Sequence, residues 1–256
     1  MSSSEKKVIT KETIKRLVAD IKDLRKNPLT EHGIYYKHDS EDMLKGYAMI
    51  IGPKDTPYEG GYYFFKFKFP TDYPHSPPKV SFYTNGHNIR MHPNLYKSKK
   101  VCLSILNTWH GESWTGCQTI SSVLLTICSV LTENPLLHEP GVSKSHIDVK
   151  SYNQIINFMN IRIAIVDVLA SKVLIKKGFK DLLDIARENF TGNYKRKLEI
   201  FEKAKKEYYE YIESLEYVPS AIVTNLYGMQ VKINYDKLEK LLEDTLINAK
   251  QVIKVV

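Results

Sequence analysis

Three cysteines, Cys102, Cys117 and Cys128, are the side chains of this 256-residue chain best suited to nucleophilic chemistry. Their number is odd and their spacing matches no paired metal-ligand signature, so we expect neither a disulfide framework nor a metal site. Cys128 falls in an apolar helical pattern, which is typical of a buried, inert thiol. Cys102 follows an irregular polar segment, so its sulfur is predicted to lie at the surface, where a thiolate can attack a carbonyl.

A cysteine nucleophile also needs hydrogen-bond donors that stabilise the oxyanion formed during acyl transfer. The candidates near Cys102 are Asn94, His92 and His110, together with backbone amides of the same segment. A papain-like enzyme would carry its own local sequence around the cysteine, and the chain has none. It also has no glycine-rich turn of the phosphate-cradling kinds, which disfavours hydride or phosphoryl transfer.

The elements that must position these residues follow from the hydrophobic pattern. Over residues 10–26, apolar side chains recur every three or four positions, which predicts an amphipathic helix with Thr10 as its N-cap. Over 34–83, short aromatic and β-branched runs with turn residues between them predict an antiparallel meander. In its clearest strand, 62–69, phenylalanine alternates with lysine, so one face is expected to be buried and the other solvated.

The rest of the chain is predicted to be one long irregular segment followed by helices. Residues 85–113 show little periodicity, and long ordered segments of this kind are commonly functional. Helices are predicted at about 119–131, 152–176, 193–217 and 235–250, with a break at 218–228. The stretch 152–176 is apolar nearly all round, so we expect it to be buried.

Charge and hydropathy exclude several classes of protein. Lysine and arginine total 37 against 29 acidic residues, a net charge of +8, but no basic run exceeds three residues and the excess is spread over both halves of the chain. We therefore expect a solvated mixed-charge surface and no nucleic-acid partner. The longest apolar stretch, 123–131, is too short to span a membrane, and residues 1–9 carry no targeting signal and are expected to be disordered. The expected location is the cytoplasm or nucleus, or the host cytoplasm if the source is a virus.

A series of short motifs runs through residues 52–125. His92-Pro93-Asn94 is followed, eight residues after the asparagine, by Cys102-Leu103. Before them stand Gly52-Pro53, Thr56-Pro57-Tyr58-Glu59-Gly60-Gly61, Phe69-Pro70-Thr71-Asp72-Tyr73-Pro74 and Pro77-Pro78-Lys79-Val80; after them stand Trp114 and Thr119-Ile120-Ser121-Ser122-Val123-Leu124-Leu125. In this order, the set resembles the core of the ubiquitin-conjugating enzyme family, over about residues 10–150.

The resemblance implies an α+β fold: an N-terminal helix, a four-stranded antiparallel meander, an active-site loop and further helices. Residues 151–256 then form a helical C-terminal extension that is expected to pack at least partly on the core. Within the family, Cys102-Leu103-Ser104-Ile105-Leu106, the enlarged loop 107–113 and the helical tail most resemble the Z-type subgroup. That likeness implies a non-standard activating enzyme and the use of both ubiquitin and a tandem ubiquitin-like modifier.

The resemblance also implies an activity. An activating enzyme, which consumes ATP, would pass the C-terminal glycine of ubiquitin or a ubiquitin-like modifier to Cys102 as a thioester, and a substrate amine, usually lysine, would then attack it. The chain itself is expected to bind no cofactor. A catalytically inactive, ubiquitin-binding scaffold of the same fold is the alternative, which the intact cysteine motif disfavours because inactive relatives typically lack the cysteine.

Further residues take their expected roles from the same resemblance. Asn94 is expected either to support the oxyanion or to brace the loop by bonding backbone, while His92 and Pro93 shape the turn that presents it. His138 and Glu139 are both candidates for the entrance used by the acceptor amine, and the sequence does not choose between them.

The expected contact surface for the activating enzyme and a ubiquitin ligase consists of Lys15, Arg16, His75, Trp114 and Thr115. His75 is polar where ring-type ligases usually meet a bulky apolar residue, so standard ring partners are expected to bind weakly. For Trp114, the alternative to a partner contact is a position in the hydrophobic core.

Overall fold

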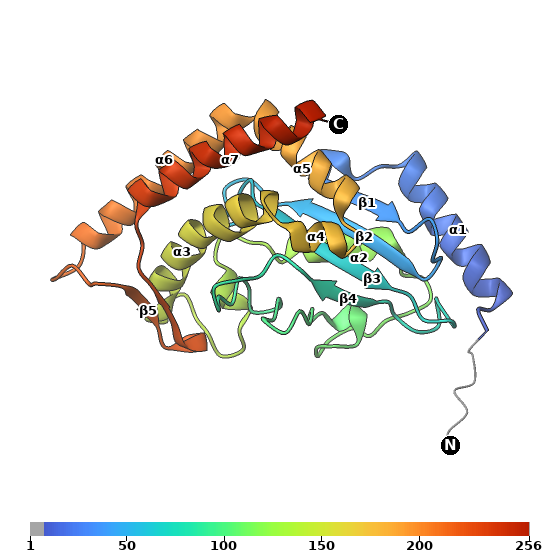
Figure 1. Ribbon diagram of the computed structural model, residues 1–256. Coiled ribbons are helices and arrows are strands. Elements are labelled where there is room, and N and C mark those ends of the chain that lie inside the picture. The colour runs from blue at the N-terminus through green and yellow to red at the C-terminus, as the bar shows by residue number, and fades with distance from the viewer. Residues whose placement is uncertain (1–7, 256) are drawn as a thin grey trace, which may run out of the picture.

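A four-stranded antiparallel sheet forms the centre of the molecule (Figure 1). The structure is a computed structural model that describes residues 8–255. The strands lie in chain order across the sheet: β1 (Ile34–His38), β2 (Lys45–Ile51), β3 (Tyr62–Lys68) and β4 (Lys79–Phe82). This confirms the predicted meander. Of the segment predicted to be disordered, residues 1–7 lie outside the described residues.

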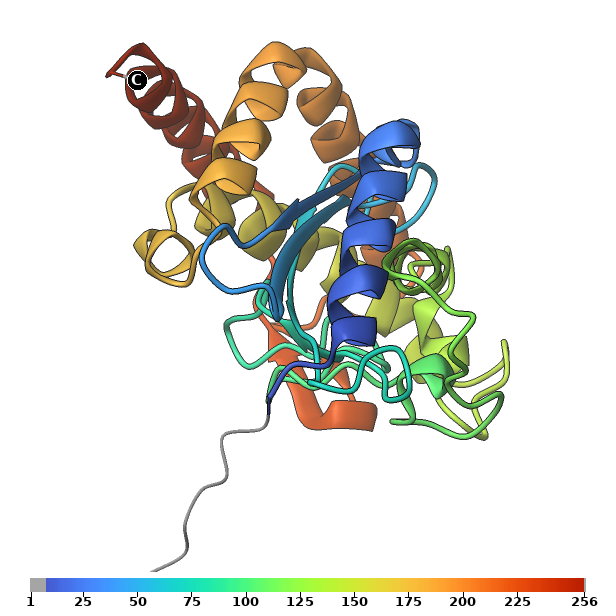
Figure 2. The ribbon, with the colours of Figure 1, turned by 90° about the vertical axis from the view of Figure 1, so that its right-hand side faces the viewer.

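Two amphipathic helices lie on the same side of the sheet (Figure 2). α1 (Lys11–Lys26) begins after Thr10, whose hydroxyl accepts a hydrogen bond from the backbone N–H of Thr13 at 3.0 Å. α2 (Ile120–Ser129) begins at a capping box formed by Thr119 and Ser122. Both helices lie where the hydrophobic pattern predicts them.

The C-terminal part of the chain is helical apart from one small hairpin. Its elements are α3 (Asp148–Met159), a π-helical continuation (Asn160–Asp167), α4 (Lys172–Lys176), α5 (Lys180–Gly192), α6 (Tyr194–Glu213), β5 (Ile222–Thr224), β6 (Met229–Val231) and α7 (Tyr235–Val255). β5 lies within the predicted break and β6 directly after it, and strands of three residues are too short to produce a detectable alternation. No helix between residues 8 and 255 is both long and apolar enough to cross a bilayer.

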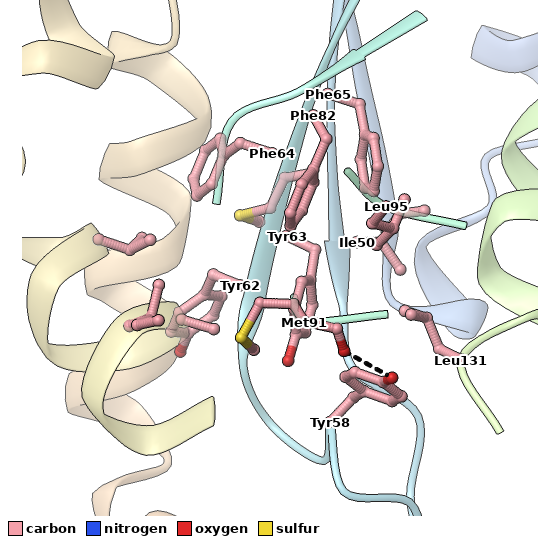
Figure 3. Close-up of a cluster of buried hydrophobic side chains, with 14 of the residues drawn as sticks. Ile50, Tyr58, Tyr62, Tyr63, Phe64, Phe65, Phe82, Met91, Leu95 and Leu131 are labelled. Atoms are coloured by element: carbon pink, nitrogen blue, oxygen red, sulfur yellow. Dashed lines mark hydrogen bonds between the residues drawn. The ribbon is translucent and has the colours of Figure 1, made fainter. Parts of the chain in front are cut away.

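The extension covers the second face of the sheet, so the prediction of a solvated face on β3 is wrong for most of the strand. Phe179, at the start of α5, is fully buried and packs on Tyr47, Phe64 and Tyr83 with ring centroids 5.2–5.4 Å apart. Figure 3 shows Tyr62 and Phe64 pointing toward the extension, while Ile50 and Leu131 lie on the opposite side of the sheet. Only the lysine end of β3 is partly solvated.

Polar contacts to one loop fix the extension on the core. Asn160 donates through Nδ2 to the backbone carbonyl of Glu59 at 2.9 Å and accepts from the Tyr63 hydroxyl at 2.6 Å. The intervening Gly61 is required because a Cβ there would meet Asn160 Oδ1 at 2.0 Å. Lys197 of α6 donates to the Gly60 carbonyl at 2.6 Å, and burial lowers the pKa of this lysine to about 8.

The irregular segment over the sheet, predicted at 85–113, is held by isolated bridges and by buried tyrosines. Its bridges join Ser81 to Lys100, His92 to Leu95 and Leu95 to Val101. The Tyr58 hydroxyl donates to the Met91 carbonyl at 2.9 Å, drawn as a dashed line in Figure 3. Tyr152 of α3 donates to the next carbonyl upstream, that of Arg90, at 2.8 Å. Both the core and the extension therefore hold the chain just before the His92-Pro93-Asn94 motif.

Candidate active site

Asn94 and Cys102 lie side by side, joined by two hydrogen bonds. The backbone N–H of Cys102 donates to the Asn94 carbonyl at 2.9 Å, and Asn94 Nδ2 donates to the Cys102 carbonyl at 2.7 Å. The bridge between Leu95 and Val101 aligns the two backbone segments. The two residues singled out as catalytic are therefore brought together, and the Asn94 amide bonds backbone, which is one of its two predicted roles.

The sulfur of Cys102 is buried, so the prediction that it lies at the surface is wrong for this structure. The residue is 1% exposed, and its thiol donates to the backbone carbonyl of Thr108 at 3.2 Å. The segment following the cysteine returns to it at Thr108. The other two thiols are more accessible: Cys117 is exposed, and Cys128 is only half-buried, so its predicted full burial is wrong.

The covering loop is closed by the hydroxyl of Thr108. This oxygen accepts from the Leu103 N–H at 2.9 Å and lies 2.8 Å from the Val101 carbonyl and 3.1 Å from the Leu103 carbonyl. A 3₁₀ turn over Ser104–Leu106 ends at Asn107, whose backbone is left-handed with φ at 54°. The side chain of Asn107 then accepts from the Trp114 N–H at 2.8 Å. Residues 103–108 thus form a compact hydrogen-bonded loop, the cover, whose Thr108 carbonyl bonds the thiol.

His92 shapes the turn that carries Asn94. It is fully buried, and its Nδ1 accepts the Asn94 backbone N–H at 2.9 Å. Burial lowers the pKa of His92 to about 3, with a smaller contribution from the neighbouring His138, whose ring centroid is 5.0 Å away. A neutral imidazole bonded in this way supports the predicted shaping role, and Pro93 completes the same turn.

His138 and Glu139 both make contacts inside the protein. His138 is half-buried, with Nε2 3.2 Å from the Thr132 hydroxyl, and burial lowers the pKa of this histidine. Glu139 accepts a hydrogen bond from the hydroxyl of Tyr227, which comes from the extension. The choice between the two residues for the acceptor entrance stays open.

Some side chains of the predicted partner surface are exposed, whereas others make hydrogen bonds within the protein. Lys15 and Thr115 are exposed, and His75 is exposed with Nε2 3.0 Å from a carboxylate oxygen of Glu12, which raises the pKa of this histidine. Arg16 makes intramolecular hydrogen bonds instead: its guanidinium donates to Asp20 at 2.8 Å and to two carbonyls of the segment after Trp114.

Trp114 is a core side chain, which corrects its placement among the partner-binding residues. It is 8% exposed, and its indole N–H donates to the Pro74 carbonyl at 2.6 Å. Its ring also packs on Tyr73 at 5.8 Å between centroids. An indole used in this way inside the protein leaves little surface for a partner.

The sequence interpretation did not single out Arg90, Tyr227 and Thr108, although all three contact the site. Arg90 donates to the carbonyls of His92 and Pro93 at 3.1 and 2.6 Å. Its position just before the motif was a signal that could have been used, whereas nothing near Tyr227 in the sequence marks its contact with Glu139. Among residues 8–255, no group of three or more histidine, cysteine or acidic side chains is arranged to hold a metal ion.

Known proteins resemble this chain over the segment that contains the site. The family model described as ubiquitin-conjugating enzyme matches residues 16–159. Ubiquitin-conjugating enzyme E2 Z of Danio rerio is 46% identical over 167 residues, which cover 64% of this chain and 50% of that protein. The Homo sapiens E2 Z is 46% identical over 160 residues, covering 61% and 45%.

A relative is also found in a virus. A probable ubiquitin-conjugating enzyme of Acanthamoeba polyphaga mimivirus is 37% identical over 191 residues, covering 67% of this chain and 13% of the viral protein. The chain spans about half the length of the E2 Z relatives. The family model matches more than half of the chain, and the matched range includes Asn94 and Cys102, so the chain belongs to the ubiquitin-conjugating enzyme family, close to E2 Z.

Proposed function

We propose that the chain accepts ubiquitin or a ubiquitin-like modifier as a thioester on Cys102 and transfers it to a substrate amine. The observation that carries this proposal is the Asn94–Cys102 pair, joined by two hydrogen bonds inside the segment that the family model matches. The family supports the partners of such a cycle: the modifier, an activating enzyme that consumes ATP, protein substrates and, in some reactions, a ligase. The chain needs no bound cofactor for these steps, and its working place would be the cytoplasm or nucleus.

The chemistry consists of two acyl transfers at one sulfur. In the first, the Cys102 thiolate attacks the carbonyl of the modifier's thioester on the activating enzyme, and the thiolate of that enzyme leaves. In the second, an unprotonated substrate amine attacks the new thioester, the carbon–sulfur bond breaks, the thiolate of Cys102 leaves and the amine loses a proton to solvent or a base. Both steps pass through an oxyanion that hydrogen-bond donors stabilise.

Asn94 is suited to two tasks at once. Its NH₂ group carries two donors, and only one of them is used on the Cys102 carbonyl. The second N–H is left for the oxyanion, so bracing and stabilisation do not exclude each other. We therefore propose that Asn94→Ala slows discharge to lysine more than it slows charging, and a lost oxyanion donor can cost about 10²–10³-fold in rate.

Charging requires the cover over Cys102 to open. The thiol is bonded to Thr108 and the residue is 1% exposed, so a modifier's C-terminal tail cannot reach the sulfur while residues 103–108 hold this arrangement. We infer that the loop moves aside when the activating enzyme delivers the modifier.

The experiment is a charging assay with an activating enzyme, ubiquitin and ATP, run on gels without reducing agent. The wild-type chain should show a thiol-sensitive shift, and Cys102→Ser should convert it to a thiol-resistant ester. Cys117→Ser and Cys128→Ser are matched controls and should charge normally. An adduct that persists in Cys102→Ala would mean that another residue carries the modifier, and failure of the wild type to charge with any activating enzyme that uses ubiquitin or its relatives would favour the inactive scaffold.

A further inference from the structure

The guanidinium of Arg90 lies close to two tyrosine rings and bonds the turn that carries Asn94. It lies 3.3 Å from the ring centroid of Tyr96, which belongs to the core, and 5.2 Å from that of Tyr227, which belongs to the extension. Its Nε donates to the carbonyl of His92 and its Nη2 to that of Pro93. The residue is only 9% exposed, so these contacts form away from most solvent screening.

Tyr227 is itself held firmly. Its backbone is left-handed with φ at 65°, which is uncommon for a residue with a bulky side chain and persists only where the surroundings enforce it. The preceding N–H, that of Leu226, donates to a carboxylate oxygen of Asp148 at 2.7 Å. The Tyr227 hydroxyl donates to Glu139, one of the two candidate residues at the acceptor entrance.

Neighbouring contacts join the same two parts of the chain. The Arg90 backbone N–H lies 3.4 Å from the sulfur of Met229 in β6, and the Arg90 carbonyl accepts from the Tyr152 hydroxyl. The small hairpin of the extension therefore contacts both the backbone and the side chain of Arg90, next to the active-site turn.

We propose that Arg90 is a positioning residue for the transfer step and that Tyr227 of the extension completes its placement. Two N–H groups of a planar guanidinium fix the carbonyls of His92 and Pro93, and these carbonyls set the orientation of Asn94 beside Cys102. Arginine suits this task because its donors form a rigid fork, which lysine lacks. The proposal rests on the proposed function and adds that the extension takes part in catalysis by orienting the site.

The rate of discharge is the quantity that this positioning affects. Misplacement of a reacting group by about 1 Å can cost about 10²-fold in rate. Charging is less sensitive because a thiolate is a strong nucleophile, whereas the weaker attack of an amine depends more on an oriented and stabilised carbonyl. A role limited to folding would lower stability and leave the discharge rate of the folded, charged molecules unchanged.

The test is single-turnover discharge of preformed thioester to free lysine, over a range of lysine concentrations and well below the melting temperature of each variant. Arg90→Lys and Tyr227→Leu are expected to lower the maximal discharge rate about 10-fold, with charging within about 2-fold of wild type. Tyr227→Phe keeps the ring over the guanidinium and loses only the bond to Glu139, so it should recover most of the rate lost in Tyr227→Leu. Tyr217→Leu, at a tyrosine of the extension that is 75% exposed, is the matched control and should discharge as wild type does.

The outcomes separate this inference from the proposed function. If wild type charges, and Arg90→Lys and Tyr227→Leu melt at lower temperature yet discharge at the wild-type rate, the positioning role is overturned and the proposed function stands. If wild type forms no thioester on Cys102, the proposed function fails and this inference fails with it. Should Tyr227→Leu not fold, the comparison of Arg90→Lys with wild type decides the role of Arg90, and Tyr227→Met replaces Tyr227→Leu as the test of the part played by the extension.

Discussion

The thiol of Cys102 donates a hydrogen bond to the backbone carbonyl of Thr108, 3.2 Å away. This thiol is the most buried of the three, although it is the one that the sequence marks for chemistry. Reactivity toward a small reagent reports directly on such a cover, because alkylation requires both access and thiolate.

We expect the three thiols to react with iodoacetamide in the order Cys117, Cys128 and Cys102, from fastest to slowest. Cys117 is exposed, Cys128 is half-buried with a pKa raised by desolvation, and Cys102 is covered. Mass spectrometry of peptides taken over a time course gives the three rates separately. Labelling of Cys102 at the rate of Cys117 would contradict the closed loop.

Thr108→Val should open the loop. The substitution keeps the branched shape and removes the hydroxyl that bonds Leu103 N–H and lies against the carbonyls of Val101 and Leu103. The hydroxyl accepts one hydrogen bond and can donate one, each worth about 1 kcal/mol, so the alkylation rate of Cys102 is expected to rise about 5- to 30-fold. Thr115→Val, at an exposed threonine in the same region, is the matched control and should leave that rate unchanged. An unchanged rate in Thr108→Val would assign the cover to other contacts.

The pairing of Asn94 with Cys102 could be predicted from sequence because family motifs fix local backbone arrangements. Burial of Cys102 could not, because it depends on a backbone carbonyl, and every residue has one. The same limit applies to β3, where alternation of phenylalanine and lysine correctly placed the strand but could not reveal that Phe179 would cover Phe64. Tyr227 is the extreme case, since its contact with Glu139 joins residues 88 positions apart.

The two tryptophans of the chain should differ sharply in their effect on stability. Trp114 is 8% exposed and bonded to Pro74, whereas Trp109 is 38% exposed. Trp114→Ala is therefore expected to lower the free energy of unfolding by about 3–5 kcal/mol, as for other large buried side chains. Trp109→Ala should change it by less than about 1 kcal/mol. Urea unfolding followed by circular dichroism gives both values, and equal effects would mean that Trp114 is not a core side chain.

His92 should make the protein less stable in mild acid. Burial lowers the pKa of His92 to about 3 in the folded chain, against 6.5 for an unperturbed histidine. Between about pH 6.5 and pH 3, His92 is therefore protonated in the unfolded chain but neutral in the folded chain. The free energy of unfolding consequently falls as the pH falls. His92 alone lowers the free energy of unfolding by up to about 1.4 kcal/mol per pH unit. This decrease stops once the pH is below the pKa of His92 in the folded protein.

Comparing wild type with His92→Asn isolates this contribution from that of His138, whose pKa burial also lowers. Asparagine can place its side-chain oxygen where Nδ1 of His92 accepts the Asn94 N–H, so the turn keeps its acceptor. The difference in unfolding free energy between wild type and variant should shrink steadily as the pH is lowered from 6 toward 4, because only wild type carries the penalty. His110→Asn, at an exposed histidine, should run parallel to wild type across this range. If the His92→Asn curve also runs parallel, the imidazole must take up its proton over the same pH range in the folded and unfolded chains, so burial does not lower its pKa.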